Sequence, residues 1–302
     1  MASLAVEDID HILNTATALK EISERPIKKV PTLRGRSIVH FFHEPSTRTR
    51  TSFDVAAKRM SADTFSISAS TSSMTKGETL LDTVATLQSM NPDIIVMRHS
   101  ASGAPHFVAR HINASVINAG DGMHAHPTQC LLDLMTANET FGKISGLKLT
   151  IVGDIFHSRV ARSNIIGFTK MGATVTVCAP CTMIPTGIDS LGAHVTHSLE
   201  EAISDADIIM ALRIQKERQN NYFFPSEREY ATIFGLSYDR LKSINKHAFI
   251  MHPGPINRGV ELSSDVADSP ESLILKQVAN GVAIRMALIY LLMGGTRDAH
   301  SN

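Results

Sequence analysis

The sequence predicts an α/β protein with two doubly wound parallel-sheet domains of similar build, joined by helices. Short strand-like runs alternate with segments in which apolar residues recur at helical spacing. The strand-like runs are mostly continuous in apolar residues, which is typical of parallel strands that helices cover on both faces. The alternation begins again after the glycine-marked segment 141–146, so we expect a second domain.

The first domain is predicted at residues 1–134. Apolar residues from Ile9 to Ile22 recur at helical spacing, so the chain is expected to open with an amphipathic helix. Strands are predicted at residues 37–42, 63–68, 93–98 and 115–118, and helices at 51–60, 79–90 and 104–110.

The second domain is predicted at residues 135–279. A helix at 127–138 leads into it, and a long helix at 272–293 follows its last strand. Strands are predicted at residues 147–152, 173–178, 193–197, 207–212 and 248–252, and helices at 160–171, 199–204 and 226–234.

Composition and charge exclude several classes of function. The chain has 302 residues, of which 43% are hydrophobic, and its 29 Lys and Arg balance 29 Asp and Glu. This neutrality gives no support to a nucleic-acid partner or an anionic membrane. The longest uninterrupted apolar run, Met286 to Met293, is too short to span a bilayer. The first residues lack the basic region of a signal peptide, so we expect a cytoplasmic protein.

Three cysteines, Cys130, Cys178 and Cys181, argue against a disulfide framework. Cys178 and Cys181 have the spacing of a redox or zinc pair, but a zinc site needs a second pair and the chain has none. The pair also closes a strand-like run rather than opening a helix. We therefore interpret Cys178 as a small apolar residue at a strand end.

The segment Ser46-Thr47-Arg48-Thr49-Arg50 carries the clearest functional signal. It joins a predicted strand to a predicted helix, where free backbone N–H groups and the positive end of the helix dipole favour an anion. Three hydroxyls and a guanidinium add donors, which is typical of a phosphate-binding nest. Taken singly, these residues could be helix caps or surface charges. The segment lacks the Gly-x-x-x-x-Gly-Lys pattern of a nucleotide-binding loop.

Further polar residues follow other predicted strands. They are Arg98, His126, Arg159, Arg213 and the pair Pro253-Gly254. Ligands of open α/β sheets bind beyond the carboxyl ends of the strands. Both the position of these residues and their polar or cationic chemistry therefore indicate a ligand site.

The string Phe42-His-Glu-Pro-Ser-Thr-Arg-Thr-Arg50 resembles the carbamoyl-phosphate signature of the aspartate and ornithine carbamoyltransferases, and other family motifs follow in the same order along nearly the whole chain. The resemblance implies a transferase in which the C-terminal helix, residues 280–302, packs back on the carbamoyl-phosphate domain. It implies catalytic roles for Arg48, Thr49, Arg98 and His126. It assigns carbamoyl-phosphate binding to Ser46, Thr47, Arg48, Thr49, Arg98, His126, Gln129, Pro253 and Gly254.

Residues 120–129 contain the family's His-Pro-Thr-Gln segment as His126 to Gln129. The resemblance implies that His126 polarises the carbonyl group and that Gln129 meets the carbamoyl amino group. Asp121, His124 and His126 could also form a metal site. The family segment uses no metal, and we expect neither a metal nor a cofactor.

The loop before the helix at 79–90 resembles a family loop that reaches into the active site of a neighbouring subunit. The resemblance assigns Ser72 and Lys76 to this shared site and therefore implies a homotrimer. Lys76 is also expected to contact the amine substrate.

The second domain is expected to bind L-aspartate. Gly153-Asp-Ile-Phe-His-Ser-Arg159 lacks the further glycines of a dinucleotide-binding motif and resembles a family element that binds carboxylates. The segment that starts at Arg213 resembles a second such element and adds Gln215. Two arginines at strand ends suit a dicarboxylate and repel the cationic side chain of ornithine. In addition, His252-Pro-Gly-Pro255 replaces the His-Cys-Leu-Pro of ornithine enzymes.

The predicted reaction is carbamoyl transfer from carbamoyl phosphate to L-aspartate in pyrimidine synthesis, by direct attack and electrostatic stabilisation of a tetrahedral intermediate. Two alternatives stay open: a non-catalytic anion-binding scaffold, and transfer to another amine such as ornithine. A regulatory or dihydroorotase-like partner is also possible.

Overall fold

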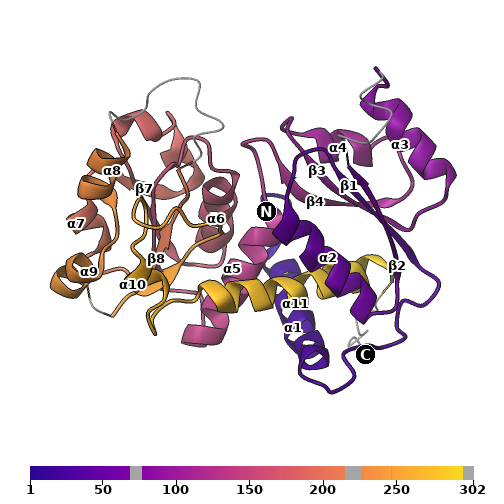
Figure 1. The fold of residues 1–302 in the computed structure, drawn as a ribbon, viewed down its shortest axis with the longest axis horizontal. Coiled ribbons are helices and arrows are strands. Elements are labelled where there is room, and N and C mark those ends of the chain that lie inside the picture. The colour runs from indigo at the N-terminus through magenta and orange to yellow at the C-terminus, as the bar shows by residue number, and fades with distance from the viewer. Residues whose placement is uncertain (69–76, 215–225, 246, 295–302) are drawn as a thin grey trace. The chain divides into compact units, whose positions relative to one another are not determined.

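The computed structural model describes residues 1–68, 77–214, 226–245 and 247–294, and the chain divides into two compact units. The N-terminal unit contains Leu4–Leu131 and the end of the chain from Ala279, and the C-terminal unit contains Met1–Ser3 and Leu132–Val278. Each unit has one parallel sheet with flanking helices (Figure 1). The predicted fold class is confirmed.

The sheet of the N-terminal unit has four parallel strands in the order β2-β1-β3-β4. The strands are β1 (Ser37–Phe42), β2 (Asp63–Ser68), β3 (Ile94–His99) and β4 (Ser115–Asp121). Helix α1 (Val6–Lys20) continues as the 3₁₀ turn η1 (Glu21–Ser23), and the other helices are α2 (Thr47–Arg59), α3 (Leu80–Ser89) and α4 (Ala104–Ala109).

Two hydrophobic clusters cover the two faces of this sheet. Alternate residues of β1 belong to different clusters: Ile38 and Phe42 pack with Phe53 of α2, whereas Val39 and Phe41 pack with residues of α3 and α4. This division follows from the pleat of a strand, which turns successive side chains to opposite faces. Burial on both faces explains why the central strands β1 and β3 are largely apolar.

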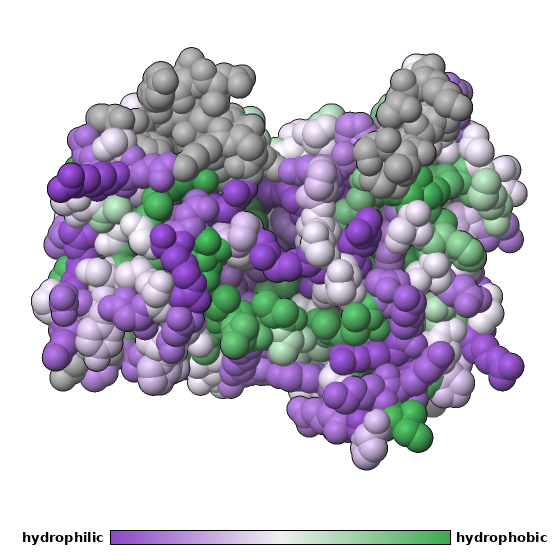
Figure 2. Space-filling view, viewed as in Figure 1, coloured by the Kyte–Doolittle hydropathy of each residue, from purple (hydrophilic) through white to green (hydrophobic). Residues whose placement is uncertain are grey.

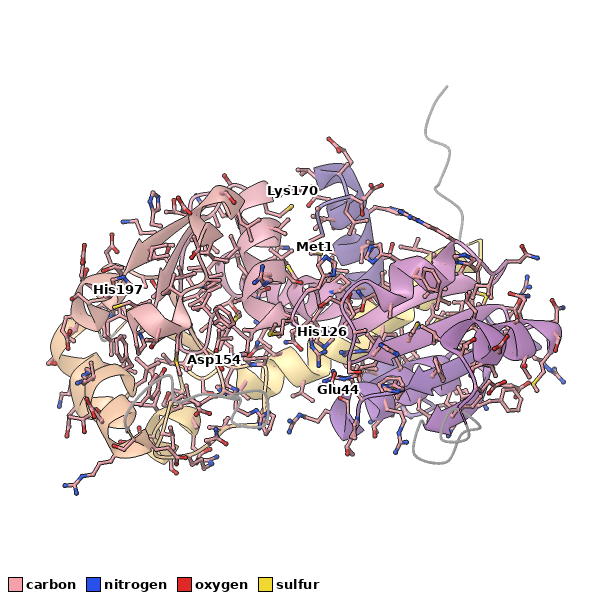
Figure 3. The ribbon with its side chains drawn as sticks, turned by 90° about the horizontal axis from the view of Figure 1, so that it is seen from above. Met1, Glu44, His126, Asp154, Lys170 and His197 are labelled. Carbon is pink, nitrogen blue, oxygen red and sulfur yellow. The ribbon has the colours of Figure 1, made fainter. Side chains whose placement is uncertain are left out.

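The C-terminal unit contains a five-stranded parallel sheet in the order β7-β6-β5-β8-β9. The strands are β5 (Lys148–Val152), β6 (Thr174–Cys178), β7 (Ala193–Thr196), β8 (Ile208–Ala211) and β9 (Phe249–Met251). The helices are α6 (Arg159–Lys170), α7 (Leu199–Ile203), α8 (Glu227–Phe234), α9 (Tyr238–Ile244) and α10 (Ser264–Ala267), with 3₁₀ turns η4 (Cys181–Met183) and η5 (Ile188–Leu191). The first residues of the chain join this unit, since Lys170 Nζ donates hydrogen bonds to the Met1 and Ala2 carbonyls at 3.0 and 2.9 Å (Figure 3).

Two helices carry the chain from one unit to the other. The assignment to units changes within α5 (Pro127–Phe141), after Leu131, and within α11 (Ile274–Leu292), after Val278. Beyond this point α11 belongs to the N-terminal unit, where Met286 and Ile289 join the cluster around Phe53.

Helix α11 has the length and apolar composition of a membrane span, but half of its most apolar window is buried. A core helix passes the same test of composition. Apolar surface lies over this helix in the face that Figure 2 shows, and its exposed residues include Leu275 and Val278. Because its other side packs in the protein core, α11 is a core helix of this fold.

The start of α2 differs from the sequence prediction. The apolar pattern placed the start at residue 51, but the helix begins at Thr47, with Ser46 as the extended residue before it. The first buried apolar residue of α2 is Phe53, so apolar periodicity could not show the polar first turn. Apolar periodicity also failed to predict α9 and α10, because each helix is short and has few apolar positions.

Candidate active site

The N-terminal sheet has its topological switch point between β1 and β3. The chain proceeds from β1 outward to β2, and then returns to place β3 and β4 on the other side of β1. In open α/β sheets, ligands bind beyond the carboxyl ends of the strands at such a point. Phe42 at the end of β1 pairs with Arg98 at the end of β3, so the loop that follows β1 lies directly beside Arg98.

The first turn of α2 carries a positive charge and no acidic residue of its own. It holds Arg48, whereas the first turn of α1 contains Glu7 and Asp8. Positive charge at the positive end of a helix dipole is unfavourable unless an anion offsets it. The Ser46 hydroxyl makes no capping hydrogen bond to the helix, and the Thr49 side chain is buried. This turn is therefore prepared for a bound anion.

The Arg98 side chain, on β3, contacts the loop after β1 and a backbone carbonyl of β4. Its side chain is only 12% exposed, its Nε lies 3.4 Å from Glu44 Oε2, and its guanidinium donates to the Ala119 carbonyl at 3.4 Å. The His43 N–H donates to the Arg98 carbonyl at 2.8 Å and holds the loop beside the strand. Glu44 balances part of the guanidinium charge. The sequence motif contains Glu44, but only the structure shows this ion pair.

His126 and Gln129 lie at the start of α5 and are both buried. The His126 carbonyl accepts the Gln129 N–H at 3.0 Å, as in a first helical turn. The loop that leads to His126 is fixed by Asp121, whose carboxylate accepts the Gly103 N–H at 2.6 Å and the Ala125 N–H at 3.2 Å. Figure 3 shows His126 and Glu44, both on the N-terminal unit.

The C-terminal sheet has its switch point between β5 and β8. Arg159 is the first residue of α6, in the segment that follows β5, and it is buried. Arg213 follows β8. The two segments approach closely at Gly153, where an added Cβ would lie 2.8 Å from the Leu212 carbonyl oxygen. Gly153 also has a φ of +129°, so both its conformation and the close contact require glycine. The sequence-predicted arginines therefore share one edge of this sheet.

A buried hydrogen-bond network supports Pro253 and Gly254. The Gly254 N–H donates to His252 Nδ1 at 2.8 Å, so the proton of this ring is on Nε2. Nε2 lies 3.3 Å from Glu261 Oε1, which also accepts the Asn257 N–H at 2.5 Å. His252 and Glu261 are both buried. Sequence reasoning missed Glu261, because nothing in a sequence shows which acid a buried histidine contacts.

The same network reaches into the helices of the C-terminal unit. The Gln277 side-chain oxygen accepts the His252 N–H at 2.9 Å, and its amide donates to Asp133 at 2.7 Å. Asp133 also accepts a hydrogen bond from Asn164 of α6 at 2.8 Å. The loop at 253–254 is therefore tied to α5, α6 and α11.

Three predicted site residues, Ser72, Lys76 and Gln215, lie outside the described residues.

Cys178 ends β6 and is buried. This burial, together with the nearby Glu200 and Glu201, raises the pKa of its thiol to about 12. A thiol with such a pKa is a poor nucleophile at neutral pH. This agrees with the interpretation of Cys178 as an apolar strand-end residue.

Comparisons with known proteins agree with this geometry. Residues 1–139 match the family model for the aspartate/ornithine carbamoyltransferase carbamoyl-P binding domain, and residues 145–292 match the model for the Asp/Orn binding domain. The chain is 64% identical to the aspartate carbamoyltransferase catalytic subunit of Desulforapulum autotrophicum over 99% of its own length and 96% of the relative's. It is 62% identical to that of Desulfosudis oleivorans, with the same coverage of both chains.

Solved structures give the same fold. Aspartate transcarbamoylase from Trypanosoma cruzi, in complex with carbamoyl aspartate and phosphate, superposes with a TM-score of 0.84 at 28% identity, covering 95% of this chain and 92% of that one. Ornithine carbamoyltransferase from Pyrococcus furiosus superposes with a TM-score of 0.86 at 30% identity, covering 98% and 96%. Because both kinds of enzyme match equally well, the fold does not identify the amine substrate.

Proposed function

The chain belongs to the aspartate/ornithine carbamoyltransferase family, and we propose that it transfers the carbamoyl group of carbamoyl phosphate to the amine of L-aspartate. The products are N-carbamoyl-L-aspartate and phosphate. The observation that carries the proposal is the acid-free, arginine-bearing first turn of α2 beside Arg98, at the switch point of the first sheet. The names of the relatives that are 61–64% identical support aspartate as the acceptor.

The phosphate group binds at the first turn of α2. Ser46, Thr47, Arg48 and Thr49 supply hydroxyls, a guanidinium and backbone N–H groups, and Arg98 approaches from β3. The phosphate takes the place of the missing acidic residue and neutralises the charge at the helix end.

The carbonyl carbon is activated by donors to its oxygen. Thr49, Arg98 and His126 supply them, and Gln129, Pro253 and Gly254 orient the carbamoyl amino group. As the carbon becomes tetrahedral, negative charge builds on the oxygen, and donors already in place stabilise it without reorganisation. The buried hydrogen bonds of His252 hold the 253–254 loop in place for this role.

L-Aspartate is held by its carboxylates. Arg159 and Arg213 at the second switch point bind them, with Gln215 and Lys76 completing the set. Holding two anions together in the correct orientation can supply effective molarities of about 10⁵–10⁸ M, so positioning and charge balance account for most of the rate. The amine attacks directly, and the leaving phosphate accepts its proton.

The other parts of the proposal concern assembly and pathway. Ser72 and Lys76 enter the active site of a neighbouring copy, which makes the enzyme a homotrimer. The enzyme works in the cytoplasm in pyrimidine synthesis. The shared site rests on the resemblance of the loop that contains Lys76 to a family loop, and the pathway rests on the product of the proposed reaction.

Binding of N-(phosphonacetyl)-L-aspartate, a ligand of a Trypanosoma cruzi relative, tests the proposal. Calorimetry should detect tight binding, which Arg98→Gln and Arg213→Gln each weaken by at least about tenfold, since each removes a charge-assisted contact. Arg110→Gln, an exposed arginine after α4, is the control and should bind normally. Absence of binding to the unsubstituted protein, or equal binding by all variants, would refute the assignment.

A further inference from the structure

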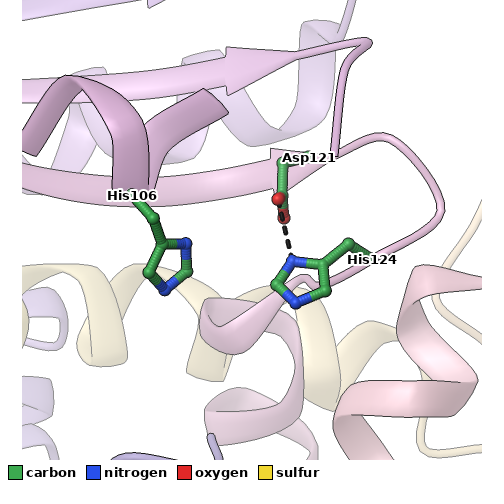
Figure 4. A group of neighbouring side chains, drawn as sticks. All are labelled: His106, Asp121 and His124. Atoms are coloured by element: carbon green, nitrogen blue, oxygen red, sulfur yellow. Dashed lines mark hydrogen bonds and ion pairs between the residues drawn. The ribbon is translucent and has the colours of Figure 1, made fainter. Parts of the chain in front are cut away.

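We propose that His106, Asp121 and His124 form a binding site for a divalent transition metal of the zinc class. One nitrogen of each imidazole and one oxygen of the carboxylate all lie within 4.8 Å of one another. Figure 4 shows the three side chains converging from helix α4, the end of β4 and the loop that follows β4. His124 Nδ1 lies 2.9 Å from Asp121 Oδ2.

The spacing is close to that of a coordinated metal. Zinc ligands lie about 2.0–2.2 Å from the ion, so ligand atoms at tetrahedral positions are about 3.3–3.5 Å apart. The largest separation here is within 4.8 Å, so the site closes with a movement of one or two side chains. His106 and His124 are exposed and have room for this movement, whereas Asp121 is buried and fixed.

The carboxylate is already oriented for a ligand. The Gly103 N–H donates to Asp121 Oδ2 at 2.6 Å, while Asn118 Nδ2 and the Ala125 N–H donate to Oδ1 at 2.8 and 3.2 Å. Such outer contacts hold a metal-binding carboxylate in a single orientation and are typical of metal sites. Asp121 therefore supplies a charged ligand without loss of side-chain entropy.

The ion pair between His124 and Asp121 does not account for the position of His106 beside them. His124 and Asp121 form a hydrogen-bonded pair, which needs no third member. Within the described part of the chain, the His106 ring makes no hydrogen bond, and it packs edge-on against His124 with ring centroids 5.8 Å apart. An ion between the two rings gives His106 a partner.

The donor set selects the metal. Two imidazoles and one carboxylate suit zinc, cobalt, nickel or copper, whereas magnesium and calcium prefer oxygen ligands. Both imidazoles are exposed, so the remaining positions are open to water. His126, which the proposed reaction uses, is buried and is not in this group. The metal therefore links α4 to the loop before His126 and does not take part in carbamoyl transfer.

Metal titration of the untagged full-length protein, after treatment with a chelator, tests the proposal. Co²⁺ should bind with one ion per chain and give the visible absorption of a four- or five-coordinate site, and Zn²⁺ should displace it. His106→Ala and His124→Ala should each lower the affinity at least as much as loss of an outer-shell partner does, about 10–100-fold. His111→Ala, an exposed histidine two residues beyond α4, should bind Co²⁺ normally.

Three results would overturn the site: no binding in the unsubstituted protein, binding unchanged in both ligand variants, or a loss in only one of them. Unfolding curves establish that each variant is folded. Metal-free His106→Ala should keep its carbamoyl-transfer activity, which separates failure of the metal site from failure of the proposed reaction.

Discussion

For Arg98, the sequence and the geometry both indicate an anion-binding side chain. A buried strand rarely ends in an arginine without a partner, and here the guanidinium meets Glu44 and the Ala119 carbonyl beside the first turn of α2. The sequence alone could indicate an anion at Arg98. It could not identify Glu44 as the carboxylate that balances its charge, because the pairing depends on the register of β1 and β3.

In the proposed reaction, replacement of Arg98 by glutamine removes a charged donor to the phosphate and to the developing oxyanion. Loss of one oxyanion donor commonly costs about 10²–10³ in rate, so kcat should fall by this factor. Steady-state assays of Arg98→Gln and of the control Arg110→Gln would measure it. A variant that retains more than about a tenth of the activity would contradict the role of Arg98.

His40 is expected to make the stability of the protein depend on pH. It lies within β1 and is buried, and both ring nitrogens lack a hydrogen-bond partner among the described residues. Burial lowers its pKa from 6.5 to about 4; Asp54 opposes this shift, while Arg50 and Lys58 add to it. Because the unfolded chain takes up the proton first, stability falls as the pH decreases from about 6.5 toward 4, by up to about 3 kcal/mol.

Chemical unfolding between pH 7.5 and 4.5 measures this effect. His40→Leu should show a shallower loss of stability with falling pH than the unsubstituted protein. His194→Gln, at an exposed position in β7, should keep the full slope. Equal slopes for all three proteins would show that His40 does not cause the dependence.

At the scale of elements, the strands were predictable and some helix boundaries were not. Each predicted strand agrees with the structure to within one residue at either end, except β4, which extends to Asp121. Continuous apolar runs define buried parallel strands well. The first turn of α2 consists of hydroxyl and arginine residues, so its helical state depends on backbone geometry after Ser46 that no apolar pattern reveals.

The sequence predicts a set of candidate site residues, but it could not predict the contacts among them. Arg159 and Arg213 follow β5 and β8, which are neighbours in the sheet although β6 and β7 separate them in the sequence, and the alternation of elements does not determine this order. The contacts between His252, Glu261 and Gln277 depend on how a loop folds back on α11, and their spacing along the chain carries no periodic signal.

Glu261 is expected to act as a positioning residue for the 253–254 loop. Glu261→Gln replaces a charged acceptor of two hydrogen bonds, each worth about 1.5–3 kcal/mol, with a neutral one. The KM for carbamoyl phosphate should rise about tenfold or more, with a smaller change in the KM for L-aspartate. Glu229→Gln, at an exposed position of α8, is the control. Equal changes in both KM values would indicate general destabilisation instead.

At the scale of the whole molecule, the proposed sharing of active sites between copies predicts the activity of mixtures of two inactive variants. A Lys76→Ala protein and a His126→Ala protein should each be inactive alone. Dissociated together and reassembled, they should regain activity, because a native site forms where an intact Lys76 of one copy meets an intact His126 of another. A mixture of Arg98→Gln and His126→Ala proteins should regain none, because the proposed site takes both of these residues from the same copy. Failure of the first mixture would contradict the trimer with shared sites.

The identity of the amine is the central claim, and the fold alone cannot decide it. The most direct measurement is carbamoyl transfer by the purified chain, with carbamoyl phosphate and either L-aspartate or L-ornithine in parallel. Turnover with L-aspartate alone is the predicted result, because Arg159 and Arg213 attract a dicarboxylate and repel a cationic side chain. Turnover with L-ornithine, or with neither amine, would contradict the proposed function.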